Sequence, residues 1–477
     1  MLLINESWIR EELGGLYGEH VVREIARINE LYAMYDGEGQ VWPTRDELSY
    51  RPNRTITNHI KKLIKAEARF MMSRAPEIRI VPEDAQDTDA AAEIEGWLRG
   101  VLAASDWQRK LIQAARDCFI GKRVALKCSG GAGRPLRIDF RPAQEFVFET
   151  AEDDTSDLRK IVFFYQTGDP AETDRKKQRI WRQRYWLDEN HRCMMDEGLY
   201  DGYGHPIDTR SDVSTGLDRI PCRVIINDGL TGDLSGESDV EALIDNQTTY
   251  NRLNSDDVDA LRFNMFPMRY IRDATEESAE NLVIAPGALA DIQSDPSSAH
   301  GAEIGMLKSS FGYDERLEHR LNRTKNDMYE LLSIPNVSLE QLKGMAQSGK
   351  GMRGLYWELM CRCEEKWAEG WDDAIRWMVE TLVHMAGTYK SAALPEISYA
   401  IKIDHLYPIP DDEEDERAGD LSEVAGQARS RMSYIAKWQP GADAEGELKQ
   451  IALEQALLND AYTGAIYEQT DIKARGE

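Results

Sequence analysis

Residues 344–351 read GMAQSGKG, and the interpretation of this stretch decides between two folds. The pattern G-x-x-x-x-G-K is that of a phosphate-binding loop, which joins a buried strand to a helix in nucleotide-hydrolysing α/β proteins. In such loops the next residue is Ser or Thr and binds magnesium, but here it is Gly351. The alternative is a glycine-rich loop between two helices of a protein without nucleotide chemistry.

The flanking sequence favours the second interpretation. The preceding segment, Leu339 to Lys343, is polar and helix-like rather than an apolar strand. Beyond the loop, apolar residues recur at helical spacing from Met352 to Met385. This pattern predicts one helix on the order of 50 Å long. The Trp and Met residues on its apolar face are interpreted as core rather than as part of a cofactor site.

Composition narrows the classes of function. The chain has 477 residues, of which 30% are charged, and no apolar run is long enough to span a bilayer. The first six residues lack the basic region of a signal peptide, so a cytosolic product is expected. The net charge is −27, whereas proteins that hold duplex DNA present basic surfaces. This charge indicates either ordinary acidic solubility or a surface that DNA passes without adhering.

Residues that could carry catalysis or bind metal form no recognisable constellation. Six scattered cysteines indicate reduced, buried thiols rather than a disulfide framework. Eight dispersed histidines complete no metal site, and His384 on the long helix is interpreted as a packed or pairing residue. Hydrolase and dinucleotide-binding motifs are absent from the sequence. We therefore predict no catalytic residue, no metal and no cofactor.

The N-terminal half has an α+β pattern. Its first 75 residues have helical periodicity, and a helix pattern returns at 84–102 and 107–119. Short strands separated by turn residues predict a mostly antiparallel sheet. The expected strands are 78–82, 123–127, 136–140, 146–149, 160–166 and 178–187, with turns at 129–133 and 200–204.

After this half, a helix, a small insertion and a second helix are predicted. The first helix runs from Ser238 to Phe263, and Glu241 lies three residues after Ser238, as in a capping box. The insertion, residues 264–310, has strand and turn patterns, and the second helix, 311–333, ends before Ile334-Pro335. One stripe on the first helix is acidic, and one on the second is basic. The acidic stripe is Asp245, Asp256 and Asp259; the basic stripe is Arg316, Arg320 and Arg323.

This order of parts resembles the portal proteins of tailed double-stranded DNA bacteriophages. The resemblance is carried by several segments between Asn53 and Ile409. They are Asn53-Arg54 with Arg74-Ala75-Pro76, 220–227, 236–240, 243–252 with Ser255-Asp256, Ile334-Pro335, and Ser348-Gly349 at the start of the long helix.

The resemblance implies a portal fold with named parts. These are a wing (1–237), a first stem helix (238–263), a clip (264–310), a second stem helix (311–333), a tunnel loop (334–350), a long wing helix with a returning strand (351–403), and an acidic helical crown (404–477). The crown region carries 17 acidic and 7 basic residues.

The resemblance also implies a function. Family members form rings of twelve subunits at one capsid vertex, through which DNA is packaged and ejected. Implied partners are the terminase large subunit, a head-completion adaptor, and the major capsid and scaffolding proteins, in the virion and, during assembly, in the host cytoplasm. The tunnel loop would meet DNA without sequence specificity through Lys343, Gly344, Gln347, Ser348, Gly349 and Lys350. We hypothesise that the acidic stripe faces the channel or a neighbouring subunit, and that the basic stripe is its partner across a subunit interface.

Overall fold

The computed structural model describes residues 2–43, 50–169, 172–265, 268–277, 292–298, 300–307, 312–337, 349–409, 413–439 and 443–456. The chain divides into two compact units, which are described separately. The first comprises residues 1–336 and 356–408, and the second comprises 337–355 and 409–477. The predicted α+β class is confirmed, and all strand pairs within the described ranges are antiparallel.

A five-stranded sheet is covered on one face by the N-terminal helices α1 (Leu2–Leu13) and α2 (Gly15–Asp36). Its strand order is β4 (Phe146–Thr150), β5 (Leu158–Thr167), β6 (Arg179–Leu187), β7 (Cys193–Tyr200) and β8 (Pro206–Ser214). Trp8 and Ile9 pack against Val162, Phe164 and Ile180. Because side chains alternate along a strand, residues of the other parity lie on the opposite face.

A second sheet of three strands packs against helices of the first unit. Its order is β3 (Arg134–Pro142), β2 (Arg123–Gly131) and β9 (Cys222–Ile226). The hairpin predicted at 129–133 is confirmed, and Gly133 adopts the positive φ of 74° that suits glycine. Helices α3 (His59–Met72), α4 (Thr88–Ala104) and α5 (Trp107–Gly121) complete this region, and β1 (Glu77–Pro82) pairs with β12 (Tyr399–Asp404).

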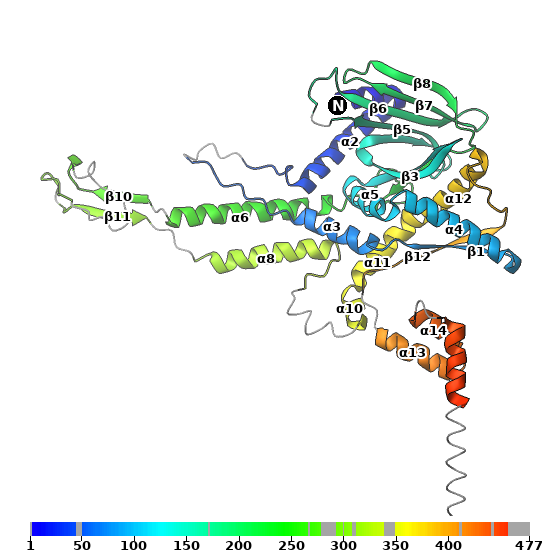
Figure 1. Ribbon diagram of the computed structural model, residues 1–477. Helices are drawn as coiled ribbons and strands as arrows, with labels where there is room; N and C mark the ends of the chain where they lie inside the picture. The colour runs from blue at the N-terminus through cyan, green and yellow to red at the C-terminus, as the bar shows by residue number, and fades with distance from the viewer. Residues whose placement is uncertain are drawn as a thin grey trace, which may run out of the picture. The chain divides into compact units, whose positions relative to one another are not determined.

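Two helices joined by a strand pair form an arm of the first unit (Figure 1). Helix α6 (Ile244–Met265) packs beside α8 (Asp314–Leu331). Between them β10 (Met268–Arg272) pairs with β11 (Glu303–Leu307), which accords with the strand-and-turn pattern predicted for this insertion. The predicted capping box is wrong, because the Glu241 carboxylate pairs with Arg27 and Lys122 instead.

The long helix is interrupted at its start, contrary to the prediction of one rod from Met352. Helix α10 (Gly349–Leu355) ends before Tyr356, and the two sides of this break belong to different units. Glycines in α10 weaken its helix propensity, whereas the Tyr356 ring stacks on Phe70 with centroids 5.2 Å apart. From Trp357 the helix continues as α11 (Trp357–Lys366), a π turn η4 (Trp367–Trp371) and α12 (Asp372–Tyr389).

The predicted core role of the Trp and Met stripe is confirmed. Trp367, Trp371, Met378 and Met385 are each at most 2% exposed. In the second unit, α13 (Glu413–Ala425) packs on α14 (Arg431–Trp438). There Asp420 accepts a hydrogen bond from the Trp438 indole at 2.7 Å, so this acidic segment contains a structured helix pair.

Candidate functional site

The buried face of α6 is polar rather than apolar. Gln247, Asn251, Ser255 and Asp259 lie four residues apart, and each is at most 5% exposed. These four side chains, here called the polar ladder, bind the backbone of the segment 53–60, which is extended up to Asn58 and then begins α3. The ladder accepts amide hydrogens from Asn53 (Asp259, 2.9 Å), Thr55 (Ser255, 3.0 Å), Thr57 (Asn251, 3.0 Å), His59 (Gln247, 2.8 Å) and Ile60 (Gln247, 3.2 Å).

The spacing of the ladder side chains along α6 nearly equals the spacing of alternate amides along the segment that they bind. Four residues of helix rise about 6 Å, and two residues of extended chain rise about 6.6 Å. Alternate amides of the segment therefore meet successive turns of α6 while the two chains run antiparallel. One step beyond each end of the ladder are Leu243 and Phe263, which cannot accept these hydrogen bonds. Therefore only one register lets all four ladder side chains accept a hydrogen bond from the segment.

Two further contacts hold the same segment in this register. The Gln247 side-chain amide donates to the Thr57 carbonyl at 2.7 Å, so Gln247 both donates to the segment and accepts from it. The Tyr50 ring meets Phe263 edge-on with centroids 5.0 Å apart. Because buried backbone groups without partners are costly, the ladder fixes the segment 53–60 along α6.

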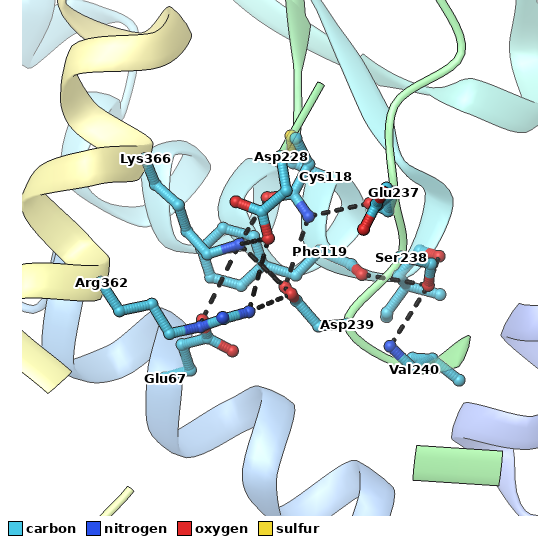
Figure 2. A network of polar contacts seen from close by, with 12 residues as sticks. Glu67, Cys118, Phe119, Asp228, Glu237, Ser238, Asp239, Val240, Arg362 and Lys366 are labelled. Atoms are coloured by element: carbon cyan, nitrogen blue, oxygen red, sulfur yellow. Dashed lines mark hydrogen bonds and ion pairs between the residues drawn. The ribbon is translucent and has the colours of Figure 1, made fainter. Parts of the chain in front are cut away.

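A second polar site joins the long helix to the segment that leads into α6 (Figure 2). Lys366 projects from α11 and is 3% exposed. Its ammonium donates to Asn227 at 2.7 Å, Asp228 at 3.0 Å and Asp239 at 3.1 Å, and lies 4.5 Å from the Phe119 ring centroid. Arg362, one turn earlier, donates to Glu67 of α3 at 2.8 Å and also to Asp239. We call these charged groups the ion cluster.

The ion cluster holds three carboxylates and two cations, so its balance depends on both cations. Glu67 is fully buried and Asp239 is 3% exposed. Burial and the neighbouring Glu67 raise the pKa of Asp239 to about 7. Burial lowers the pKa of Lys366, but Asp239 and Glu67 outweigh it, and the pKa is raised overall. The cluster therefore ties α3, α11 and the 227–239 segment into one rigid junction.

A third polar contact fastens the segment that follows β12. The two ring nitrogens of His405 lie 2.8 Å from a Glu364 oxygen and 2.9 Å from an Asp372 oxygen. The ring also stacks on Trp367 with centroids 4.5 Å apart. A neutral imidazole has one donor and one acceptor, so only the imidazolium donates to both carboxylates. Burial lowers the pKa of His405, but the bonds to Asp372 and Glu364 outweigh it and raise the pKa overall.

The pH dependence of the His405 contact can be predicted with its sign. Because its folded-state pKa is raised, the stabilisation is fully present below the unfolded pKa of about 6.5 and is lost as pH rises through the folded value. We expect His405→Gln to lower the protection of residues 404–408 from hydrogen exchange by about 1–3 kcal/mol at pH 6. The difference from wild type should shrink as pH is raised towards about 9. His20→Gln is the control, because His20 is exposed. A difference independent of pH would contradict the charged contact.

A comparison of the sequence with known protein families identifies the family of this chain. A family model described as phage portal protein, SPP1 Gp6-like, matches residues 16–459 of the 477. The chain belongs to the phage portal protein family. The predicted resemblance is thereby confirmed, and the chain is placed among structural, capsid-associated components of bacteriophages. Among curated proteins, no sequence gives a significant match.

The predicted portal stripes can now be placed on the arm. Asp259 lies in the polar ladder on the buried face of α6, whereas Asp245 and Asp256 are exposed. The acidic stripe is therefore divided between two faces. The basic stripe is exposed along α8, and within the described residues no acid pairs with Arg316, Arg320 or Arg323. The proposed pairing between portal subunits remains a prediction.

The predicted tunnel-loop residues fall mostly outside the described residues. Lys343, Gly344, Gln347 and Ser348 lie outside them, and Gly349 and Lys350 begin α10. Within the described ranges no group of three or more His, Cys, Asp or Glu residues is arranged to hold a metal ion. No described helix is both long and apolar enough to cross a membrane.

Sequence reasoning missed the polar ladder and the ion cluster. The ladder has a visible signal, since Gln247, Asn251, Ser255 and Asp259 repeat every four residues on one helix face. Lys366 also carried a signal, because it lies beside Cys363 and Trp367 on the apolar side of the long helix. Neither pattern predicts which residues these side chains contact, because the contacted residues are more than 100 positions away in the chain.

Proposed function

We propose that this chain assembles into a ring of twelve at one capsid vertex, and that the ring is the channel for packaging and ejecting DNA. The supporting observation is the α6–α8 arm together with the family match. All buried residues of α6 are polar, and Leu261, Phe263 and Met265 near its end are 44%, 51% and 72% exposed. An arm with so little apolar core of its own is stabilised by neighbouring copies.

The charge of the chain suits passage of DNA. Twelve copies would carry a formal charge of about −324, which is twelve times −27. An acidic channel lining repels the phosphates and so lets the duplex move without adhering. In this proposal Lys343 and Lys350 of the tunnel loop supply brief phosphate contacts, which replace the nucleotide chemistry considered for residues 344–351. No catalytic role is proposed.

The other portal parts receive their functions in the same proposal. The clip at 264–310 would dock the terminase large subunit and later the head-completion adaptor. The wing and crown would face the major capsid and scaffolding proteins. The polar ladder and the ion cluster would transmit load between the wing and the stem. The ladder connects the segment 53–60 to α6, and the ion cluster connects α3 to the long helix.

The proposed channel function is tested in infected cells. When the gene for this chain carries a stop codon, particles should contain no packaged DNA, and wild-type protein supplied from a plasmid should restore DNA-filled particles. Lys350→Ala should also restore filling if the protein is a conduit. It should fail to do so under the alternative function, a nucleotide-hydrolysing packaging motor that uses Gly344 to Lys350. Filled particles in the complete absence of the protein would contradict the proposal.

Reversal of the basic stripe tests the subunit contact separately. We expect Arg320→Glu to reduce the fraction of protein in rings on the order of tenfold, because it places an acid against the acidic face of the neighbouring stem. The measurement is the sedimentation profile of purified protein. Arg109→Glu, at an exposed wing position, is the matched control. Intact rings in Arg320→Glu would show that the stripes do not pair.

A further inference from the structure

A cleft of about 800 Å³ opens on the second face of the five-stranded sheet, away from α1 and α2. Its floor is formed by Gln183 and Tyr185 of β6 and by Met195 and Glu197 of β7. The β2–β3 hairpin and the end of α12 form its walls. The cleft exists because the three-stranded sheet covers only part of this face.

The rim of the cleft is basic in a strongly acidic protein. Arg134 and Arg137 of β3 and Arg210 of β8 line it. The Arg210 guanidinium lies 3.5 Å from the Glu197 carboxylate. It thereby neutralises the one carboxylate on the floor. Arg134 and Arg137 are exposed, and neither forms an ion pair within the described part of the chain. Since the chain has 85 acidic and only 58 basic residues, two unpaired arginines that line one cleft mark a place for an external anion.

The floor adds apolar and hydrogen-bonding surface to this charge. Tyr185 and Met195 present apolar surface, and the Gln183 carbonyl is held by the buried ammonium of Lys127. On the wall, Met385 and Tyr389 of α12 extend the apolar surface. A site of this size, with apolar side chains and a few fixed polar groups on its floor, has the character of a ligand-binding cleft.

We propose that this cleft binds an extended acidic peptide segment of a partner protein. Carboxylates of the segment would pair with Arg134 and Arg137 at the rim, and alternate apolar side chains would rest on Tyr185 and Met195. A nucleic acid fits less well, because a bound strand presents a continuous row of phosphates, whereas Arg134 and Arg137 are the two unpaired cations of this lining. This inference goes beyond the channel function and does not rest on ring formation.

The test is a binding measurement on the purified full-length protein. The probes are short fluorescein-labelled peptides in which Leu alternates with Glu, with Lys or with Ser, and a labelled single-stranded oligonucleotide. Fluorescence anisotropy should show binding of the Glu peptide in preference to the others. The variant Arg134→Glu/Arg137→Glu should weaken this binding by about tenfold or more. The control Arg99→Glu/Arg109→Glu makes the same charge change at exposed positions of α4 and α5 and should leave binding unchanged.

A second variant keeps the test independent of any folding defect. Arg210→Glu should also weaken the Glu peptide, because it adds a second carboxylate beside Glu197. Equal binding of the Glu and Lys peptides, or equal loss in the control variant, would overturn the proposal. Binding of the oligonucleotide that depends on Arg134 and Arg137 would also overturn it, in favour of a phosphate site.

Discussion

Lys366→Met is expected to destabilise the junction between the long helix and α3 by about 3–5 kcal/mol. The substitution keeps the length and apolar packing of the side chain but removes the ammonium. Asp239 and Glu67 then remain buried beside Arg362 alone. Hydrogen exchange of α3 and α11 measures the loss locally, which suits a chain of two units. Lys402→Met is the control, because Lys402 is exposed in its contact with Asp404, and its cost should be about 1 kcal/mol or less.

Two further measurements distinguish the charge from the packing. Adding Asp239→Asn to Lys366→Met removes one stranded carboxylate and should restore part of the stability. Because the pKa of Asp239 is already raised, loss of the ammonium raises it further, and protonation relieves the repulsion. The defect of Lys366→Met should therefore be smaller at about pH 5 than at about pH 8. If the loss of stability in Lys366→Met changes neither with pH nor on addition of Asp239→Asn, Lys366 stabilises the junction by packing alone.

Gln247→Leu/Asn251→Leu is expected to release the segment 53–60 from α6. The double variant strands the amides of Thr57 and Ile60, whereas the His59 amide and the Thr57 carbonyl keep only the hydrogen bond between them. Each stranded group costs about 1–3 kcal/mol, but the segment can partly reach water when it moves. We therefore expect a total loss on the order of 4 kcal/mol. Amide exchange of residues 53–60 reports it directly.

The matched control for the ladder is Asn254→Leu, the same kind of substitution on the same helix. Asn254 is half-buried and makes no side-chain hydrogen bond within the described residues. Its effect should be within about 0.5 kcal/mol. If Asn254→Leu and the ladder variant accelerate exchange equally, the introduction of leucine into α6, and not loss of the ladder, would explain both.

The elements of the arm were predictable because each depends on local sequence. Helical periodicity predicted helices at 238–263 and 311–333 without knowledge of distant residues, and the structure has them at 244–265 and 314–331. The hairpin at 129–133 follows in the same way from its glycines. The order of these parts was enough to indicate the portal family, which the match over residues 16–459 confirms.

The contacts between elements were not predictable from periodicity. The acidic stripe on α6 indicated a face towards the channel or a neighbouring subunit. Asp259 nevertheless accepts a hydrogen bond from the backbone amide of Asn53, 206 residues away. The break at Tyr356 also escaped prediction, because the apolar spacing continues through it while the chain passes between two compact units. Local patterns report which residues share a face, and only the folded chain determines what meets that face.

The most direct test of the portal assignment is the mass and image of the purified protein. Native mass measurement should give twelve times 54.3 kDa, about 650 kDa. Electron micrographs of the same sample should show rings with a central hole, in agreement with a channel. A monomer or dimer at the concentrations used for imaging, or a closed particle without a hole, would contradict the account.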